Sequence, residues 1–386
     1  MKKFTGLLKL EFRRIFSNSV LMAIFFGAPI GYGILFGYVY QQAKVKDLPI
    51  VIVDQDQSPA SDKIIDAFED NEGLHVSDVR SIPGDIKNEM PVKQYVAVIT
   101  LPTDFEKDLL QKKHPEVRVD LNMANILNAN TASNHINTVL MTINAGIEIE
   151  GLKKQGLHPE QAKASYESFK INFNKLYNST GNYVTFMLPG LLAAIMQQII
   201  FLAMALAFSR DFEDGYFGKL VKESKSSIYH IGLKATPFLI MLPFMWLIIS
   251  LILSFFNVGV EVINFQMLIL TTLLTFASMF IGMLFSIAIP SQLKATELLM
   301  VISTPAFILS GFTWPTSAIP EVITNVARFI PVTQYLSGFR KVAFYGGDFT
   351  SIMPEIKFLT GVILVAVITM ILLLQFKINR LNRRQN

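Results

Sequence analysis

The sequence predicts an α-helical polytopic membrane protein with six transmembrane helices and an extracytoplasmic α/β insert on helical stalks. The first observation is composition: 51% of the 386 residues are hydrophobic and the mean hydropathy is +0.42, more than a soluble domain of this size can bury. The second is that these residues form runs near the length of about 20 that crosses a bilayer. The third is that residues 41–181 are soluble in character and alternate strand and helix signals.

The composition also excludes several classes of function. The formal net charge of +4 is small, and the Lys and Arg residues lie mostly beside apolar runs, which is typical of topology signals rather than a nucleic-acid surface. The sequence has no Cys, no histidines at metal-ligand spacing, no nucleophile elbow and no P-loop. We therefore expect no enzyme activity, no metal, no cofactor bound by this chain and no nucleic-acid partner.

Residues 1–18 predict a cytoplasmic helix that lies in the membrane interface. Apolar residues recur there at helical spacing and basic residues surround them, a pattern that anionic cytoplasmic lipids attract. The residues that define this helix are Phe4, Leu8, Phe12, Arg13 and Arg14. The alternative is that the segment is only the cytoplasmic flank of the first span.

Residues 19–40 predict the first transmembrane helix, which we interpret as a retained signal-anchor because no small-residue cleavage site follows it. Pro29 and several glycines make this helix irregular and allow close helix approach.

Residues 41–181 predict the α/β insert with its stalk helices. The expected elements are strands at 49–54, 74–79, 95–101 and 117–121, helices at 59–70 and 103–113, and two long stalk helices within 126–177. Thr103 and Glu106 have the spacing of a capping box for the second helix. Asp54 and Asp56, at a strand end, could hold a ligand or only form a turn.

Residues 182–376 predict transmembrane helices 2–6. The expected spans are about 183–208, 231–256, 265–289, 293–312 and 357–376. After the first of these comes a charged and aromatic loop, residues 209–225. This loop is either a handle through which an outside partner moves two helices, or an ordinary connector with a helix C-cap at Gly215.

Residues 313–356 are aromatic, proline-rich and only partly polar, as expected for short helices that re-enter the membrane or lie at its interface. Residues 377–386 form a basic tail. Basic residues flank both the first and the last span, so both termini are expected to be cytoplasmic. The loop 209–225 is then cytoplasmic, and the insert and residues 313–356 face outward.

Four segments resemble permease subunits of type-2 ATP-binding-cassette (ABC) exporters, in the subfamily with a large external insert after the first span. Residues 210–215, RDFEDG, are similar to that family's cytoplasmic loop, with Tyr216 where a Thr is common. The other similar segments are VIVDQDQSP at 51–59, SGFTWP at 310–315, and IPVTQY at 330–335 with a later Arg. The resemblance covers essentially the whole chain.

The resemblance implies roles for two sets of residues. Those implied to couple to an ATPase are Arg210, Asp211, Phe212, Glu213, Gly215 and Tyr216. Those implied for an extracytoplasmic gate region are Trp314, Pro315, Pro331, Thr333 and Arg340.

The resemblance also implies partners and a mechanism. Two copies, or this chain and a homologue, would dock on cytoplasmic ABC ATPase subunits that bind ATP and Mg, through helix 1–18 and loop 209–225. The dimer would sit among the lipids of a bacterial inner (plasma) membrane and export an amphipathic, lipid-like or drug-like cargo. An envelope adaptor protein is left open as a further partner.

Two competing classes of function remain. The first is a non-transport membrane assembly or sensor protein whose external α/β domain binds an envelope partner. The second, a multipass enzyme, is disfavoured because no cluster of acids and histidines lies at a membrane face.

Overall fold

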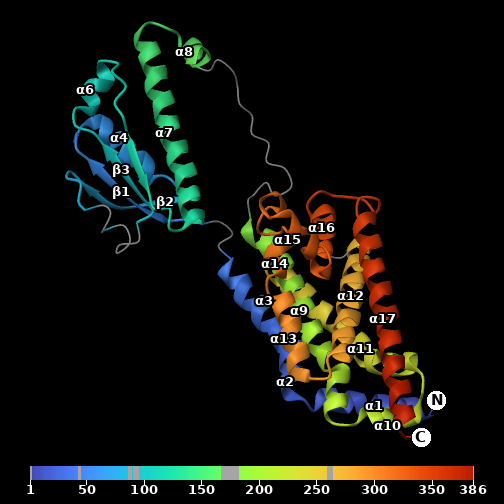
Figure 1. Cartoon of the computed structure of the whole chain (residues 1–386). Helices are drawn as coiled ribbons and strands as arrows, with labels where there is room; N and C mark the ends of the chain where they lie inside the picture. Colours follow the sequence, from blue (N-terminus) through green and yellow to red (C-terminus); the bar gives the residue numbers. More distant parts are fainter. Residues whose placement is uncertain are drawn as a thin grey trace. The chain divides into compact units, whose positions relative to one another are not determined.

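The computed structural model describes residues 2–41, 45–85, 89, 95–166, 182–258 and 264–385. The chain divides into two units (Figure 1). The insert unit covers Lys44–Asn174, and the helical unit combines Met1–Ala43 with Lys175–Asn386.

The insert unit is built on a four-stranded mixed sheet in the order β2-β1-β3-β4. The strands are β1 (Leu48–Asp54), β2 (Leu74–Arg80), β3 (Ala97–Leu101) and β4 (Arg118–Leu121). β1 pairs in parallel with β2 and β3, and β4 is antiparallel to β3. The prediction of an α/β unit that is parallel in part is confirmed.

The central strand β1 is buried on both faces, as its continuous apolar run predicts. One face packs against Ile64 and Phe68 of α4 (Pro59–Glu69) and against Ile136 of α7 (Ile126–Lys154). Among its described residues this unit also contains the helices α6 (Phe105–Leu110) and α8 (Pro159–Tyr166). The expected break between stalk helices lies at the end of α7, where Gly156 has φ +92°. The predicted second stalk helix lies partly outside the described residues.

The capping box predicted at Thr103 and Glu106 is wrong. Asp104 precedes α6 with φ +59° and makes no side-chain cap. Instead the carboxylate of Asp56, from the β1–α4 turn, accepts 2.9 Å hydrogen bonds from the amides of Phe105 and Glu106. A local motif was expected, but a residue about 50 positions earlier satisfies the free amides of this helix start.

Asp54 is a turn former. Its carboxylate accepts hydrogen bonds of 3.0 Å from the amides of Asp56 and Gln57 and one of 2.7 Å from the Ser61 hydroxyl. The same turn starts α4, because Ser58 and Ser61 form a capping box. Asp54 and Asp56 therefore make the contacts expected of residues that form a turn and cap helix starts.

The helical unit contains five helices that are long and apolar enough to cross a membrane, among the described residues. They are α9 (Tyr183–Glu213), α11 (Ser227–Phe255), α12 (Phe265–Ala288), the pair α13 (Gln292–Ser303) with α14 (Ala306–Leu309), and α17 (Met353–Gln385). The predicted first span is shorter and irregular. It consists of α2 (Ser19–Met22), a π-helical turn (Ala23–Gly27) and α3 (Ala28–Val39).

The π turn directly precedes α3, which has Pro29 in its first turn. Proline lacks the amide that would continue an α-helical ladder, and a π turn is one way a helix adjusts at such a point. The irregularity predicted for this span is confirmed.

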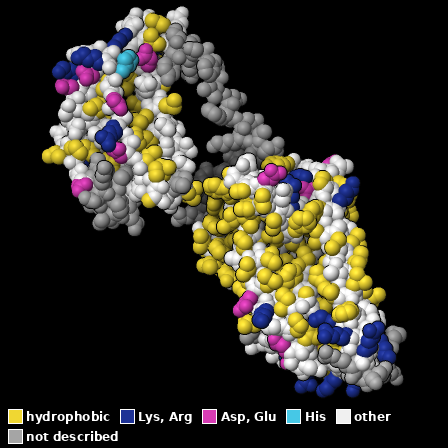
Figure 2. Space-filling model, in the orientation of Figure 1, with side chains coloured by type: hydrophobic (Ala, Val, Ile, Leu, Met, Phe, Trp, Pro, Cys, Tyr) yellow, Lys and Arg dark blue, Asp and Glu magenta, His cyan; other side chains and the backbone are white. Residues whose placement is uncertain are grey.

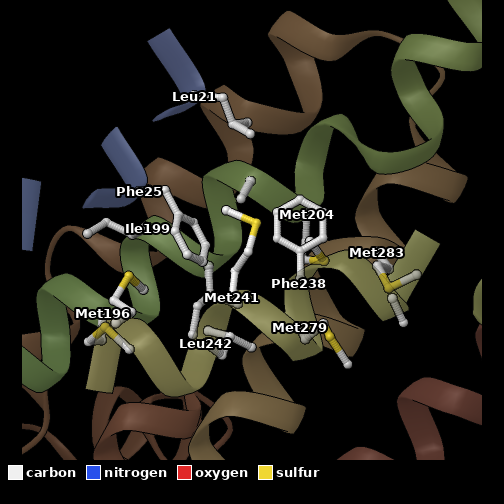
Figure 3. Close-up of a cluster of buried hydrophobic side chains, with 14 of the residues drawn as sticks. Leu21, Phe25, Met196, Ile199, Met204, Phe238, Met241, Leu242, Met279 and Met283 are labelled. Carbon is white, nitrogen blue, oxygen red and sulfur yellow. The ribbon is translucent and has the colours of Figure 1, made fainter. Parts of the chain in front are cut away.

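α9 and α12 pack closely in the centre of the helical unit. A Cβ at Gly282 of α12 would lie 2.6 Å from Cβ of Met204 in α9, so this contact requires a glycine. Met196, Met241 and Met283 are fully buried or nearly so and belong to the same hydrophobic cluster as Phe25 (Figure 3). They form ordinary helix packing within this chain.

Two further differences from prediction concern helix lengths. α9 runs through Glu213, and α10 (Phe217–Glu223) follows after a short turn, so most of the expected loop 209–225 is helical. α17 continues as one helix to Gln385, so the tail at 377–386 is not a separate segment within the described residues. Figure 1 shows α1 (Lys2–Phe16), α10 and both termini at the same end of the helical unit.

Candidate functional site

The last turn of α9 carries a buried aspartate that pairs with two cations. Oδ1 of Asp211 lies 2.7 Å from Nη1 of Arg14 in α1, and Oδ2 lies 2.5 Å from Nζ of Lys234 in α11. The carboxylate is fully buried and Lys234 is 4% exposed. Asp211 therefore joins α9 to α11 and to α1, which is distant in sequence.

Glu11 completes a cluster of four charges. Its Oε1 lies 2.9 Å from Nζ of Lys234 and 3.6 Å from Nη1 of Arg14. Two carboxylates and two cations balance one another in a place where an unpaired charge would be very costly. We call Glu11, Arg14, Asp211 and Lys234 the charge cluster.

Glu213 joins α9 to α13. Its Oε1 accepts a 2.9 Å hydrogen bond from the amide of Gln292, the first residue of α13, and its Oε2 accepts one from the Gln292 side chain. A carboxylate suits this place because a helix N-terminus has free amides and a positive dipole end. Unlike Asp211, Glu213 is exposed to solvent.

Two more contacts tie the end of α9 to α12 and α17. The hydroxyl of Ser286 in α12 accepts hydrogen bonds from the amides of Phe208 and Ser209, at 2.9 and 2.8 Å. Nζ of Lys377 in α17 lies 4.4 Å from the centroid of the Phe212 ring, a cation–π geometry. The last turns of α9 thus contact α1, α11, α12, α13 and α17.

The turn after α9 matches the C-cap interpretation of Gly215. Gly215 has φ +67°, the left-handed conformation that glycine adopts without strain after a helix end. The guanidinium of Arg14 lies 4.7 Å from the centroid of the Tyr216 ring. Burial raises the pKa of Tyr216, and the Glu11 carboxylate raises it further, so the ring stays a neutral phenol. Arg210 points to Asp214 at 3.6 Å and is partly exposed.

A helix, α1, covers the residues predicted to lie at the membrane interface, and its less exposed side contains most of the predicted apolar residues together with the acidic Glu11. Ile15 and the acidic Glu11 are the buried residues of α1. Phe4 stacks edge-on against Tyr229 of α11, with ring centroids 5.4 Å apart, and Arg13 is exposed. Leu8 and Phe12 are half-buried. α1 therefore packs on the helical unit through a mixture of apolar and charged contacts.

The predicted gate region divides into an exposed and a buried part. Trp314 is 55% exposed and Pro315 is exposed as well. Nη2 of Arg340 donates to the carbonyls of Gly311 and Phe312, at 2.9 and 3.3 Å, and so holds the turn after α14. That turn leads to a short 3-10 turn (Thr316–Ala318) and α15 (Glu321–Ala327).

The buried part begins at Pro331, the first residue of α16 (Pro331–Ala343). The next amide, that of Val332, donates a 2.7 Å hydrogen bond to Oε1 of Gln197, which is buried near the middle of α9. Thr333 lies in this first turn and is half-buried. The start of α16 thus contacts the middle of α9, and the re-entrant placement of this segment stays a prediction.

These features define an integral membrane protein whose spans converge on one charged helix end. The chain belongs to a family described as ABC-2 family transporter protein, whose model matches residues 19–372. The resemblance to ABC permeases is therefore confirmed, and membership implies partnership with an ABC ATPase subunit. Among the described residues no group of acids and histidines could hold a metal ion.

Several curated proteins are similar to the chain. It is 23% identical over 343 residues to the inner membrane transport permease YhhJ of Escherichia coli (strain K12), 85% of each chain. It is 22% identical over 310 residues to the probable multidrug ABC transporter permease YbhR of the same strain, 76% of each chain. ABC transporter G family member 20 of Dictyostelium discoideum is 22% identical over 241 residues, 61% of this chain and 31% of that protein. No solved structure matches.

Sequence reasoning missed Glu11, Lys234 and Gln197. Lys234 and Gln197 are polar side chains within apolar stretches, and in a membrane protein that placement indicates a buried partner. For these two the sequence shows that a partner is needed. It does not show which residue the partner is. Glu11 lies among basic residues and carries no such signal.

Proposed function

We propose that this chain is the transmembrane subunit of an ATP-driven ABC exporter of the bacterial inner membrane. Its six spans would comprise the five long helices and the broken helix from Ser19 to Val39. Both termini and the charge cluster would be cytoplasmic, because Lys and Arg concentrate beside the first and last spans. The insert and the segment with α15 and α16 would face outward.

The observation that carries this proposal is the convergence of five helices on the last turns of α9. A cytoplasmic ATPase that contacts α1, α10 and the turn between α9 and α10 would act on a point where Asp211 and Glu213 already hold α1, α11 and α13. Movement of that point would reach the spans without passing through a flexible linker. ATP and Mg would bind in the partner.

The cargo we propose is an amphipathic, lipid-like or drug-like molecule that passes between two copies of the chain, or between this chain and a homologue. One support is that the relative YbhR is described as a probable multidrug ABC transporter permease. Another is that the spans are largely uncharged away from the charge cluster, whereas proton- or sodium-coupled transport uses acids within the membrane. An envelope adaptor that binds the insert would complete the path outward.

The test replaces Asp211 by asparagine in tagged full-length chain purified from native membranes. A P-loop ATPase should co-purify and be identified by mass spectrometry. Loss of one partner of a desolvated charge pair costs about 2–5 kcal/mol, and about 1.4 kcal/mol is tenfold. Asp211→Asn should therefore lower ATP hydrolysis by the complex more than tenfold.

The matched control is Asp214→Asn, three residues further along. Asp214 is 50% exposed, and its contacts with Arg14 and Arg210 are 3.5 and 3.6 Å long, so hydrolysis should change less than about twofold. Equal effects of the two variants, at equal protein levels, would reject transmission through the charge cluster. Absence of any co-purifying P-loop ATPase would reject the exporter assignment itself.

A further inference from the structure

A long apolar groove lies between α13 and α17 in the helical unit. Its accessible volume is about 720 Å³, within the range of pockets that hold small molecules. α9 and α12 form its floor, through the buried Phe201 and through Phe285, and α14 and α15 line one end. Figure 2 shows the hydrophobic side chains of the visible face of this unit in a broad band, with charged side chains gathered at either end.

The groove carries a single charged residue, Lys357, near the start of α17. Lys357 is exposed and forms no ion pair with any described residue. The nearby Lys341 differs, because its Nζ lies 2.6 Å from Oε1 of Glu355 and is neutralised there. The groove therefore combines an apolar channel with one available cation at its rim.

Gly361 keeps the groove open. It lines the groove one turn after Lys357, and a Cβ placed on it would have no neighbour within 4 Å. The glycine at the α9–α12 contact is different, because there a Cβ would collide with Met204. The missing side chain of Gly361 thus serves no contact between helices of this chain, and leaves room beside α17.

We propose that this groove binds one acyl chain of an anionic phospholipid, with the head group held at Lys357. An acyl chain gains free energy for each methylene it buries, and the groove offers it an almost wholly apolar surface. The cation fixes the position of the head group, because Lys near a membrane surface attracts anionic lipid. A helix of a second copy would have to supply a counter-charge for Lys357, because burial of an unpaired ammonium is unfavourable.

The occupied groove would bridge α13 and α17 along the stretch from Lys357 to Ala366, about 14 Å at 1.5 Å per residue. A bound chain would therefore restrain two helices that are tied to the end of α9 at the opposite end, α13 through Glu213 and α17 through Lys377. The lipid site is independent of the transport proposal, because it needs only the helical unit in a bilayer.

The experiment uses the full chain in nanodiscs of phosphatidylcholine with a minor fraction of phosphatidylglycerol that carries a photoreactive acyl chain. Cross-links should concentrate on peptides with Leu299 and Val365, and Gly361→Phe should reduce them at least about fivefold because it fills the groove. Gly31→Phe is the control, since Gly31 of α3 also has open space but lies outside the groove. At both positions a Cβ has no neighbour within 4 Å.

The head-group contact is tested with the same lipids. Lys357→Gln should remove a preference of about fivefold for phosphatidylglycerol over phosphatidylcholine, equivalent to about 1 kcal/mol. Lys357→Arg should keep it. Unchanged cross-linking in Gly361→Phe would overturn the site, and an unchanged preference in Lys357→Gln would overturn the anionic specificity. Because the chain has no Cys, disulfide-linked dimers of Gly361→Cys would identify a second copy as the occupant instead.

Discussion

Replacing Lys234 by methionine would leave two carboxylates of the charge cluster with one cation. Nζ of Lys234 lies 2.5 Å from Oδ2 of Asp211 and 2.9 Å from Oε1 of Glu11, and only Arg14 would remain near both acids. Methionine preserves the apolar stem, so the lost charge dominates the effect. Breaking a buried ion pair costs about 3–5 kcal/mol, which lowers the melting temperature of a unit this size on the order of 10 °C.

The assay is thermal unfolding of the purified full chain, followed by intrinsic fluorescence. The double variant Glu11→Gln with Lys234→Met removes one acid and one cation, and leaves Arg14 paired with Asp211. It should therefore recover at least about 1 kcal/mol relative to the sum of the two single variants. Lys219→Met in α10 is the control, because Lys219 is exposed and its loss should cost within about 0.5 kcal/mol.

Two outcomes would refute this reasoning. One is a Lys234→Met variant that unfolds at the same temperature as Lys219→Met. The other is strict additivity of the two single substitutions in the double variant, since residues that share one ion-pair network should show a coupling energy. Either result would mean that the four charges do not act as a unit.

Two further predictions concern hydrogen bonds at helix starts. Gln197→Leu leaves the Val332 amide without its acceptor and should lower the free energy of unfolding by about 1–3 kcal/mol, measured by thermal unfolding. Gln198→Leu, at the next position of α9, is the control. An equal loss of stability in both variants would contradict the role of Gln197. In the insert, burial alone would raise the pKa of Asp56, but hydrogen bonds from Ser58 and from amides of α6 lower it. The stability that its carboxylate contributes is therefore present above the unfolded pKa of about 3.9 and is lost as the pH falls through the lower folded value. Asp56→Asn should then destabilise the insert by about 1 kcal/mol at pH 7 and by less below pH 4, as circular dichroism melts would show; a pH-independent difference would contradict this.

The elements of the fold could be predicted because they depend on local pattern. The bounds of β1 and α4 lie within one residue of those expected from the apolar run and the Ser58–Pro59 helix start. The lengths of α9, α11 and α12 follow from apolar runs that match a bilayer. The predicted end of α9 was less accurate. The charged residues 210–213 suggested a loop, whereas in the structure they are helical and contact other helices.

The site was only partly predictable because its contacts are not local. The motif RDFEDG located Asp211 and Glu213 but gave them one shared role, whereas Asp211 is buried in the charge cluster and Glu213 is an exposed cap on α13. α1 was assigned to the membrane interface from its apolar spacing. That spacing contains Glu11, and only the position of Lys234 in three dimensions explains why an acid faces inward.

Gln197 and the helix start at Pro331 form a pair in which each needs the hydrogen-bond partner that the other supplies. A glutamine in the middle of an apolar span requires a partner that is not lipid. A proline at a helix start is followed by amides that have no acceptor within their own helix, and Val332 carries the first of them. Pairing this unsatisfied donor with the buried acceptor places the start of α16 beside the middle of α9, at the level of Gln197. The sequence does not decide between Gln197 and Gln198, because that choice depends on which face of α9 meets α16.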